Sequence, residues 1–265
     1  MTHSRLLIAI ALGIALASCT RAHESVDIAT TTSLDGSGLL QELRAQFKED
    51  TGIELDAFVV GSGQAMRMAR RGVVDLIITH DPVNESQFVL TERPLIYRQF
   101  MWNDFIIVGP TSDPASVRSA HSAAEAFRRV HAAHAKFGSR NDQSGTHVKE
   151  LAIWRAAGIS PASNPNYLPF GQPMAHLLRS CEELQAYTLS DRATFDQLSK
   201  HLSLVIEYQG DPTLRNVYAL TLMRPRNARG YGNAQKFARW LLSDRGRRVV
   251  ESFTIHGHRE FFWIP

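Results

Sequence analysis

The chain has 265 residues, of which 44% are hydrophobic and 21% charged, and a formal net charge of +3. These proportions are typical of a globular protein. A charge so near neutrality excludes the concentrated basic surface of a nucleic-acid-binding protein. Two cysteines exclude a cysteine-rich zinc or iron–sulfur centre, and the histidine pairs His131/His134 and His256/His258 lack further ligands at useful spacing. We therefore expect neither a metal cation site nor a cofactor.

The N-terminus is typical of an export signal. Arg5 precedes an apolar run over residues 6–17, which is too short to span a bilayer permanently but fits the core of a signal peptide. The run ends in Leu-Ala-Ser-Cys, which resembles the bacterial lipobox. We expect residues 1–18 to be a lipoprotein signal peptide, Cys19 to carry the lipid and residues 19–25 to form a tether. The alternative is an ordinary signal peptide in which Cys19 is incidental.

Along the remaining chain, apolar runs alternate with helical periodicity. Helical spacing of apolar residues includes the set Met174, Leu177, Leu178 and Cys181, so we expect the Cys181 thiol to face the core. We expect strands over residues 26–30, 55–60, 73–79, 105–108, 186–189, 204–206 and 217–223, with amphipathic helices between them. This alternation predicts an α/β fold with largely parallel sheets. Two sets of βα units predict two lobes with a binding cleft between them.

Three loops share one design, in which hydroxyl-bearing residues or glycines lie between a strand end and a helix. They cover residues 30–38, 61–65 and 139–147. The start of a helix offers unpaired N–H groups and the positive end of a dipole, and glycine lets the backbone approach closely. For one loop alone, helix capping and turn formation are the simpler interpretation. Three such loops together favour a site for a tetrahedral oxyanion.

The same segments resemble a known family, the tungstate-binding periplasmic proteins of ABC transporters. The resemblance covers residues 26–262 and rests on Thr-Thr-Thr-Ser at 30–33, Val-Gly-Ser-Gly-Gln-Ala at 60–65 and Ser-Arg-Asn-Asp-Gln-Ser-Gly-Thr-His at 139–147. It implies a two-lobed type II periplasmic-binding-protein fold, each lobe a mostly parallel sheet flanked by helices. It implies crossings near residues 109–110 and 210–212, giving one lobe of residues 26–109 and 213–265 and a second of residues 110–212. The implied partners are an ABC permease and its ATPase.

Carried over by motif, the resemblance also implies a set of oxyanion ligands. The set is Thr32, Ser33, Ser62, Gly63, Arg140, Ser144, Gly145 and Thr146, with Thr31 and Gln172 as weaker candidates. This chain departs from the family at Asn141, where a glycine is usual, but asparagine tolerates left-handed geometry. A second departure is Phe170 in place of threonine, which weakens the case for a ligand contact there.

The identity of the anion follows from donor chemistry. Tungstate and molybdate are fully deprotonated near neutral pH and only accept hydrogen bonds, whereas phosphate keeps a proton in part and gains from a carboxylate acceptor. We interpret Asp142 as a helix cap or as the partner that orients Arg140. We therefore expect an exported, membrane-anchored monomer that binds tungstate or molybdate on the periplasmic side.

Three alternatives stay open. A phosphate or sulfate receptor has similar requirements, and an anion-sensing receptor would engage a sensor in place of a permease. An enzyme on the same fold is the third, because Asp142, Ser144 and His147 superficially resemble an acid, a nucleophile and a base. Residues three apart share a helix face, so His147 more simply supports the loop, and we expect no catalysis.

Overall fold

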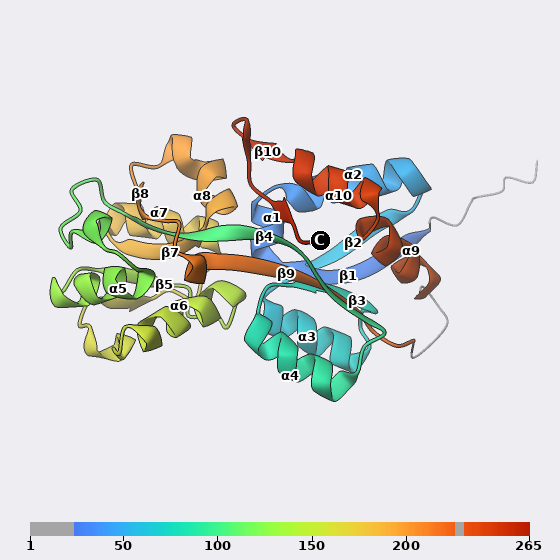
Figure 1. The fold of residues 1–265 in the computed structure, drawn as a ribbon, viewed down its shortest axis with the longest axis horizontal. Coiled ribbons are helices and arrows are strands. Elements are labelled where there is room, and N and C mark those ends of the chain that lie inside the picture. The colour runs from blue at the N-terminus through green and yellow to red at the C-terminus, as the bar shows by residue number, and fades with distance from the viewer. Residues whose placement is uncertain (1–23, 226–230) are drawn as a thin grey trace, which may run out of the picture.

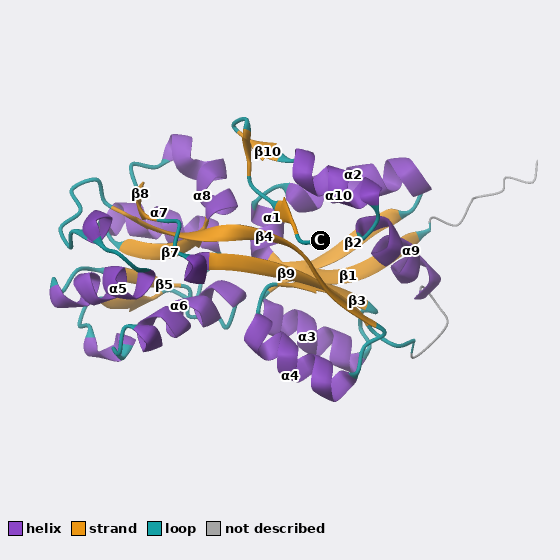
Figure 2. Cartoon of the chain, viewed as in Figure 1, coloured by secondary structure: helices purple, strands orange, loops and turns teal. Residues whose placement is uncertain are grey.

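The computed structural model describes residues 24–225 and 231–265, so the expected signal peptide and Cys19 lie outside the described residues. Helices cover both faces of a long, twisted sheet, and two strands run through its centre from one half of the molecule to the other (Figure 1). The predicted α/β class is confirmed, and Figure 2 shows strands at the centre with helices outside. None of the helices in the described ranges combines the length and the apolar content that crossing a membrane requires.

The first lobe contains the N-terminal third and the C-terminal end of the chain. Its strand β1 pairs in parallel with both β2 and β3. Its elements are β1 (Ser25–Thr31), α1 (Thr32–Gly36), α2 (Leu39–Thr51), β2 (Glu54–Val60), α3 (Ser62–Arg71), β3 (Leu76–Thr79), α4 (Pro82–Glu92), α9 (Tyr231–Leu241), α10 (Asp244–Ser252), β10 (Thr254–Ile255), β11 (His258–Arg259) and β12 (Phe262–Trp263).

The second lobe is built from the middle of the chain. Its strand β5 pairs in parallel with both β6 and β7. Its elements are α5 (Ala123–Ala132), β5 (Phe137–Ser139), α6 (Gly145–Ala156), β6 (Tyr167–Pro169), α7 (Met174–Leu184), β7 (Tyr187–Asp191), α8 (Arg192–Leu198) and β8 (Val205–Tyr208), with short 3-10 turns η1 (Val117–Ser119), η2 (Pro161–Ser163), η3 (Ser199–His201) and η4 (Pro212–Leu214).

Two antiparallel strands, β4 (Ile96–Gly109) and β9 (Arg215–Leu222), join the lobes (Figure 1). β4 pairs with β9 from Ile96 to Asp104 and then with β7 and β8 from Phe105 onwards. The change of partner occurs within one continuous strand, so the strands of both lobes belong to one continuous sheet. The lobe boundaries expected at residues 110 and 213 stay a prediction.

Two predicted strands begin three or more residues away from their start in the structure, and the others agree within two residues. The strand expected from residue 73 begins at Leu76, because α3 ends in a left-handed Gly72. Gly72 N–H donates to Ala69 O (2.9 Å) and Val73 N–H to Met68 O (3.0 Å), so Val73 still belongs to the helix cap. The strand expected over residues 105–108 extends back to Ile96, because the polar pairs Arg98–Gln99 and Asn103–Asp104 interrupt the apolar run.

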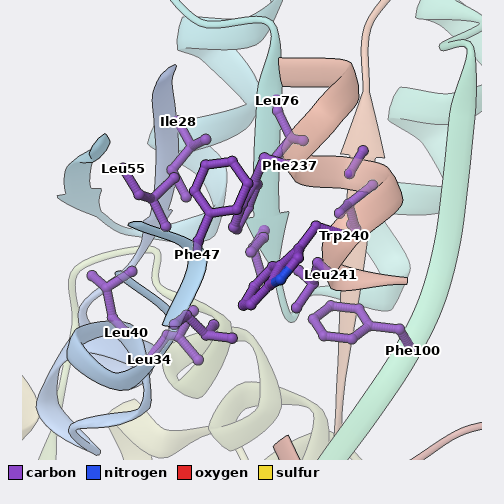
Figure 3. Close-up of a cluster of buried hydrophobic side chains, with 14 of the residues drawn as sticks. Ile28, Leu34, Leu40, Phe47, Leu55, Leu76, Phe100, Phe237, Trp240 and Leu241 are labelled. Carbon is purple, nitrogen blue, oxygen red and sulfur yellow. The ribbon is translucent and has the colours of Figure 1, made fainter. Parts of the chain in front are cut away.

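Each lobe has its own hydrophobic core. In the first, aromatic side chains of α2 and α9 meet over the sheet (Figure 3), with the rings of Phe47 and Phe237 5.0 Å apart and edge to face. In the second, Phe127, Phe137 and Trp154 form a similar cluster on the face that α5 and α6 cover. The prediction that Cys181 faces the core is confirmed, since its side chain is fully buried. The buried residues form four clusters, two mainly in each lobe, which hold the loops of each lobe rigidly.

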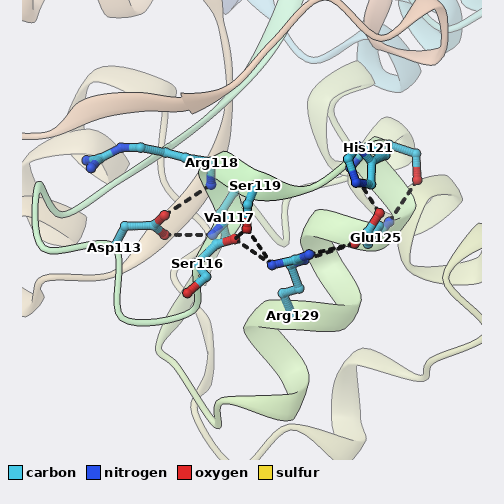
Figure 4. Close-up of polar contacts among 9 residues, drawn as sticks. Asp113, Ser116, Val117, Arg118, Ser119, His121, Glu125 and Arg129 are labelled. Atoms are coloured by element: carbon cyan, nitrogen blue, oxygen red, sulfur yellow. Dashed lines mark hydrogen bonds and ion pairs between the residues drawn. The ribbon is translucent and has the colours of Figure 1, made fainter.

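A polar network fixes the segment before α5 (Figure 4). Asp113 accepts hydrogen bonds from the backbone N–H groups of Val117 (2.8 Å) and Arg118 (3.0 Å). Arg129 on α5 donates to Ser116 O (3.0 Å) and pairs with Glu125. These contacts hold the segment between β4 and α5 against α5 in the second lobe.

Candidate functional site

The first loop joins β1 to α1 and presents four consecutive hydroxyl-bearing residues, Thr30 to Ser33. Thr31 caps α1, because its Oγ1 accepts a hydrogen bond from Leu34 N–H (3.3 Å). The preceding Thr30 donates to Ile78 O of β3 (3.2 Å), which fixes the end of β1. Ser33 is buried and Thr32 half-buried, so the loop is a rigid part of the first lobe.

The second loop joins β2 to α3, and Ser62 is the first residue of the helix. Ser62 Oγ accepts a hydrogen bond from His80 N–H (3.3 Å), so its own O–H remains available to donate. A Cβ atom added at Gly61 would lie 3.6 Å from Ser144 Cα, and one at Gly63 would lie 3.7 Å from Gln143 O. The glycines therefore lie where α3 of the first lobe approaches α6 of the second.

The third loop joins β5 to α6 and has an unusual backbone. Asn141 and Gln143 adopt positive φ angles of 42° and 60°, which non-glycine residues rarely do. Side chains hold this geometry: Ser139 Oγ accepts from Asn141 N–H (3.2 Å), His147 Nδ1 from Gln143 N–H (3.1 Å), and Asp142 Oδ1 from Ser144 N–H (3.0 Å). The expectation that asparagine replaces glycine in a left-handed turn is confirmed.

Arg140 links this loop to the first lobe. Its Nε donates to Asp142 Oδ2 (3.0 Å), and Nη2 contacts both Asp142 and Thr32 Oγ1, the latter at 3.4 Å. The side chain is 2% exposed, yet its Nη1 has no hydrogen-bond partner among the described residues. Thr146 Oγ1 is buried and unpartnered in the same sense. A buried donor without a partner is costly, so both atoms indicate a ligand.

The base of the third loop rests on a buried carboxyl group. Glu150 Oε2 accepts from Ser139 Oγ (2.7 Å) and Oε1 from Tyr167 O–H (2.8 Å). Burial raises the pKa of Glu150 to about 7. Burial also lowers the pKa of His147, and the nearby Arg140 lowers it further while Asp142 opposes this. His147 therefore remains the neutral acceptor that Gln143 N–H requires.

His80 brings the two lobes into contact at the start of α6. A Cβ atom added at Gly145 would lie 2.6 Å from the His80 ring and from His80 O, so only glycine fits there. His80 Nδ1 hydrogen-bonds Asn216 Oδ1 of β9 (2.9 Å). Burial lowers the pKa of His80 to about 4, partly opposed by the Asn216 hydrogen bond. The imidazole of His80 is thus neutral, and it lies between Gly145 of α6 and Asn216 of β9.

The structure brings together almost the whole predicted set. Residues at the junction of the three loops are Thr31, Thr32, Ser33, Ser62, Gly63, Arg140, Ser144, Gly145 and Thr146. The weaker candidate Gln172 differs: within the described residues its side chain bonds to Ser180 Oγ (3.5 Å) and to none of the three loops. The role of the nine residues at the junction as ligands stays a prediction.

A groove of about 490 Å³ borders this junction on the side of α3, α4 and α6. Gly63, Gln143 and His147 belong to its lining, and Arg67 supplies a positive charge. The groove is lined by both lobes, so its width depends on how closely they approach.

Sequence reasoning missed three residues at the junction, namely His80, Asp191 and Thr194. Asp191 Oδ2 and Thr194 Oγ1 are buried and have no hydrogen-bond partner in the described part of the chain. A signal was present, since each residue lies where a strand gives way to a helix, as in the three chosen loops. Neither junction contains glycine, the feature that drew attention to the others.

Comparisons with known proteins agree with this architecture. The PBP superfamily domain matches residues 17–245. The tungstate-binding protein TupA of Peptoclostridium acidaminophilum is 36% identical over 88% of this chain and 83% of its own length.

Two solved structures are also similar. The tungstate ABC transporter structure from Geobacter sulfurreducens superimposes with a TM-score of 0.79 and 35% identity, covering 87% of this chain and 99% of that one. TupA from Desulfovibrio alaskensis gives 0.77 and 34%, covering 91% and 99%. The chain therefore belongs to the PBP superfamily and, within it, to the family of the TupA tungstate-binding proteins.

Proposed function

We propose that this protein is the substrate-binding receptor of an ABC importer and captures tungstate. The observation that carries the proposal is a junction of three loops rich in hydrogen-bond donors. Two of these donors, Arg140 Nη1 and Thr146 Oγ1, are buried and have no partner in the described residues. The names of similar proteins support the choice of anion, and molybdate is the nearest alternative.

The hydroxyl groups at the junction support a fully deprotonated anion. The oxygens of Thr31, Thr32, Ser62 and Ser144 each already accept an N–H hydrogen bond, at 3.3 or 3.4 Å. Each hydroxyl hydrogen then remains to be donated outwards. Tungstate offers acceptors only and satisfies such a site. We propose as ligands Thr32, Ser33, Ser62, Gly63, Arg140, Ser144, Gly145 and Thr146, with Thr31 beside them.

Phosphate and sulfate are the competing anions. A phosphate site gains from a carboxylate that accepts the remaining phosphate proton. Both oxygens of Asp142 are engaged, Oδ1 by Ser144 N–H and Oδ2 by Arg140. Asp142 is therefore a positioning residue for Arg140, and this favours tungstate over phosphate.

The geometry gives little support to catalysis. Ser144 Oγ accepts from the backbone N–H of His147 (3.3 Å), while the His147 ring accepts from Gln143 N–H. The ring is thus occupied in holding the loop and does not activate the serine hydroxyl. Binding without turnover is the function that these contacts favour.

Capture requires the lobes to move relative to each other. We propose a hinge in the crossing strands β4 and β9, with one lobe of residues 26–109 and 213–265 and the other of residues 110–212. The anion binds to one lobe, the second lobe closes over it, and the permease and its ATPase recognise the closed form. We propose that the receptor acts as a monomer; a sensor in place of the permease is the alternative partner.

Export and anchoring complete the proposal. We propose cleavage after residue 18 and lipid attachment at Cys19, which would hold the receptor at the periplasmic side of the membrane. Fractionation of cells that express the full chain tests this. The Cys19→Ser variant should leave the membrane fraction, and an unchanged membrane fraction would contradict the anchor.

Isothermal titration calorimetry with tungstate, molybdate, sulfate and phosphate tests the central proposal. We expect tight binding of tungstate and weak binding of phosphate. Arg140→Gln should lower the tungstate affinity by at least about 100-fold, because it removes charge-assisted hydrogen bonds worth about 1.5–3 kcal/mol each.

Arg129→Gln is the matched control, because Arg129 also pairs with a carboxylate but lies on α5. Its tungstate affinity should equal that of the wild type. No heat with tungstate or molybdate would refute the function, and tight phosphate binding would replace it with a phosphate receptor.

A further inference from the structure

Asp191 is a buried carboxyl group that the anion site described so far does not use. It is the last residue of β7, and its Oδ1 caps α8 by accepting a hydrogen bond from Thr194 N–H (2.9 Å). Its Oδ2 has no hydrogen-bond partner in the described residues, although the side chain is fully buried. One oxygen thus has a structural role, and the other is unexplained.

The topology places Asp191 at the same sheet edge as the proposed anion site. β5 and β7 are parallel neighbours in which Gly138 pairs with Thr188, so both strands end at the same edge. At that edge β5 continues into Arg140 and β7 ends at Asp191. On the other side, a Cβ atom added at Gly36 would lie 3.3 Å from Thr194 Oγ1, so the start of α8 contacts α1 of the first lobe. Asp191 therefore lies between the loops that carry the proposed ligands.

The surroundings of Asp191 favour its neutral form. Arg140 is the cation that faces it, but Arg140 forms its ion pair with Asp142. Tyr218 of β9 and Glu260 of the C-terminal segment also face it, and neither supplies a positive charge. Burial raises the pKa of Asp191, while hydrogen bonds from Thr194 and the charge of Arg140 oppose this in part. A buried carboxylate without an ion-pair partner is costly, and a proton on Oδ2 would remove that cost.

We propose that Asp191 is a specificity-determining residue, a protonated carboxyl whose Oδ2–H donates a hydrogen bond to the bound oxyanion. This inference rests on the proposed function. A protonated Asp191 adds one more donor and suits tungstate, whereas an ionised Asp191 would repel tungstate and accept the proton of hydrogen phosphate. The protonation state of one side chain thus separates the two anions.

Infrared difference spectroscopy and calorimetry on the full-length protein test the proposal. At neutral pH the tungstate-bound wild type should show the carbonyl stretch of a protonated carboxyl group that Asp191→Asn lacks. The asparagine amide keeps both the α8 cap and a donor. Asp191→Asn should therefore bind tungstate within about threefold of the wild type, well under 1 kcal/mol.

Two further variants separate the possible roles. Asp191→Ala should lose about tenfold or more in tungstate affinity, because a donor to a charged group is worth about 1.5–3 kcal/mol. Asp142→Asn, which removes an ion-paired carboxylate, should weaken binding but leave the protonated-carboxyl band in place.

The proposal is overturned if the wild type lacks this band, or if Asp191→Asn binds tungstate more than about tenfold tighter than the wild type, as the removal of an ionised repulsive group would predict. Either result would leave tungstate capture itself intact. Failure of the wild type to bind tungstate at all would instead refute the proposed function.

Discussion

The hydroxyl group of Thr146 allows a direct test of the proposed ligand site. It is buried at the start of α6, and no described residue satisfies its Oγ1. Thr146→Val keeps the shape and removes the hydroxyl. We expect tungstate affinity to fall about tenfold to 100-fold, since one hydrogen bond to a charged ligand is worth about 1.5–3 kcal/mol. The ligand-free protein should lose no stability, because its unpartnered polar group is removed.

Thr188→Val is the control for this prediction. Thr188 Oγ1 donates to Gly138 O (2.8 Å) within the second lobe, so its loss should lower the thermal midpoint and leave tungstate affinity unchanged. Calorimetric titration and thermal unfolding of both variants give the comparison. Equal affinity losses in the two variants would show that Thr146 acts only through stability.

Glu150 makes the stability of the protein depend on pH. Its pKa is raised by burial from an ordinary value of 4.5 to about 7. A raised carboxyl pKa stabilises the fold fully at low pH, and that stabilisation is lost as the pH rises from about 4.5 through 7. The loss amounts to about 3 kcal/mol, at 1.36 kcal/mol per pH unit. Glu150→Gln should remove this part of the pH dependence.

Urea unfolding of the wild type and Glu150→Gln at pH values on either side of this window measures the effect. The free energy of unfolding should fall less in the variant than in the wild type as the pH rises. The amide can still bond to Ser139 and Tyr167, so the loop should keep its form. Parallel pH profiles would contradict a protonated Glu150.

At the scale of elements, the start of α6 must approach the end of β3 closely. An added Cβ at Gly145 would overlap both the ring and the carbonyl oxygen of His80, at 2.6 Å. Gly145→Ala should therefore prevent full closure and lower tungstate affinity by at least about tenfold, the cost of losing one or more ligand hydrogen bonds.

The matched control is Gly232→Ala in α9, where an added Cβ meets nothing within 4 Å. Alanine favours a helix, so this variant should be stabilised by about 0.5 kcal/mol without any change in affinity. Tungstate titration of both variants measures the two affinities. If Gly145→Ala binds tungstate as tightly as the wild type, the close contact between Gly145 and His80 is not required for binding.

Elements and loops differ in how far sequence predicts them. Continuous apolar runs such as that over residues 105–108 mark buried strands well, because burial on both faces leaves little room for polar residues. Strand ends were misjudged where a helix cap or pairs of polar residues altered the pattern, as at Val73 and at residues 96–104. The first boundary depends on the local cap at Gly72 and the second on the pairing with β9, which is a tertiary contact.

The sequence predicted the three loops that form the site, but it did not reveal every residue that determines the chemistry of the site. Glycine and hydroxyl residues at strand-to-helix junctions pointed to the three loops, and the resemblance to the tungstate-binding proteins supplied the nine residues that the structure gathers together. Asp191 was missed because an isolated acid before a helix is usually a cap, and His80 because the residue after it, Asp81, is the one that caps α4. Only the fold reveals that Asp191 Oδ2 has no partner among the described residues and that His80 packs against another lobe.

At the scale of the whole molecule, two lobes with separate cores share two crossing strands. In the proposed hinge motion each lobe would move as a unit, while β4 and β9 keep the lobes in register. The contacts between lobes include hydrogen bonds of Arg140 with Thr32 and of Gln197 with Ser37 O (2.9 Å), and Ala193 of α8 packs in the core of the first lobe. Opening the lobes would have to break these contacts.

His80 is where these parts meet, so its titration should affect the whole molecule. It lies after β3, contacts Gly145 of the second lobe and hydrogen-bonds Asn216 on β9, which in turn donates to Asn103 on β4 (2.7 Å). Its pKa is lowered from an ordinary 6.5 to about 4 by burial. A lowered histidine pKa gives stabilisation that is complete above about 6.5 and is lost as the pH falls through 4.

The loss on acidification amounts to about 3 kcal/mol for this group. His80→Gln, which cannot be protonated and can still donate to Asn216, should be less stable than the wild type at neutral pH because its packing is poorer. Its thermal midpoint should nevertheless fall less between pH 7 and pH 5, within the window that the lowered pKa of His80 defines. Differential scanning calorimetry at several pH values measures both effects. If both proteins lose stability equally on acidification, His80 is not the titrating group, and carboxylates whose pKa is lowered, such as Asp113, must account for the loss.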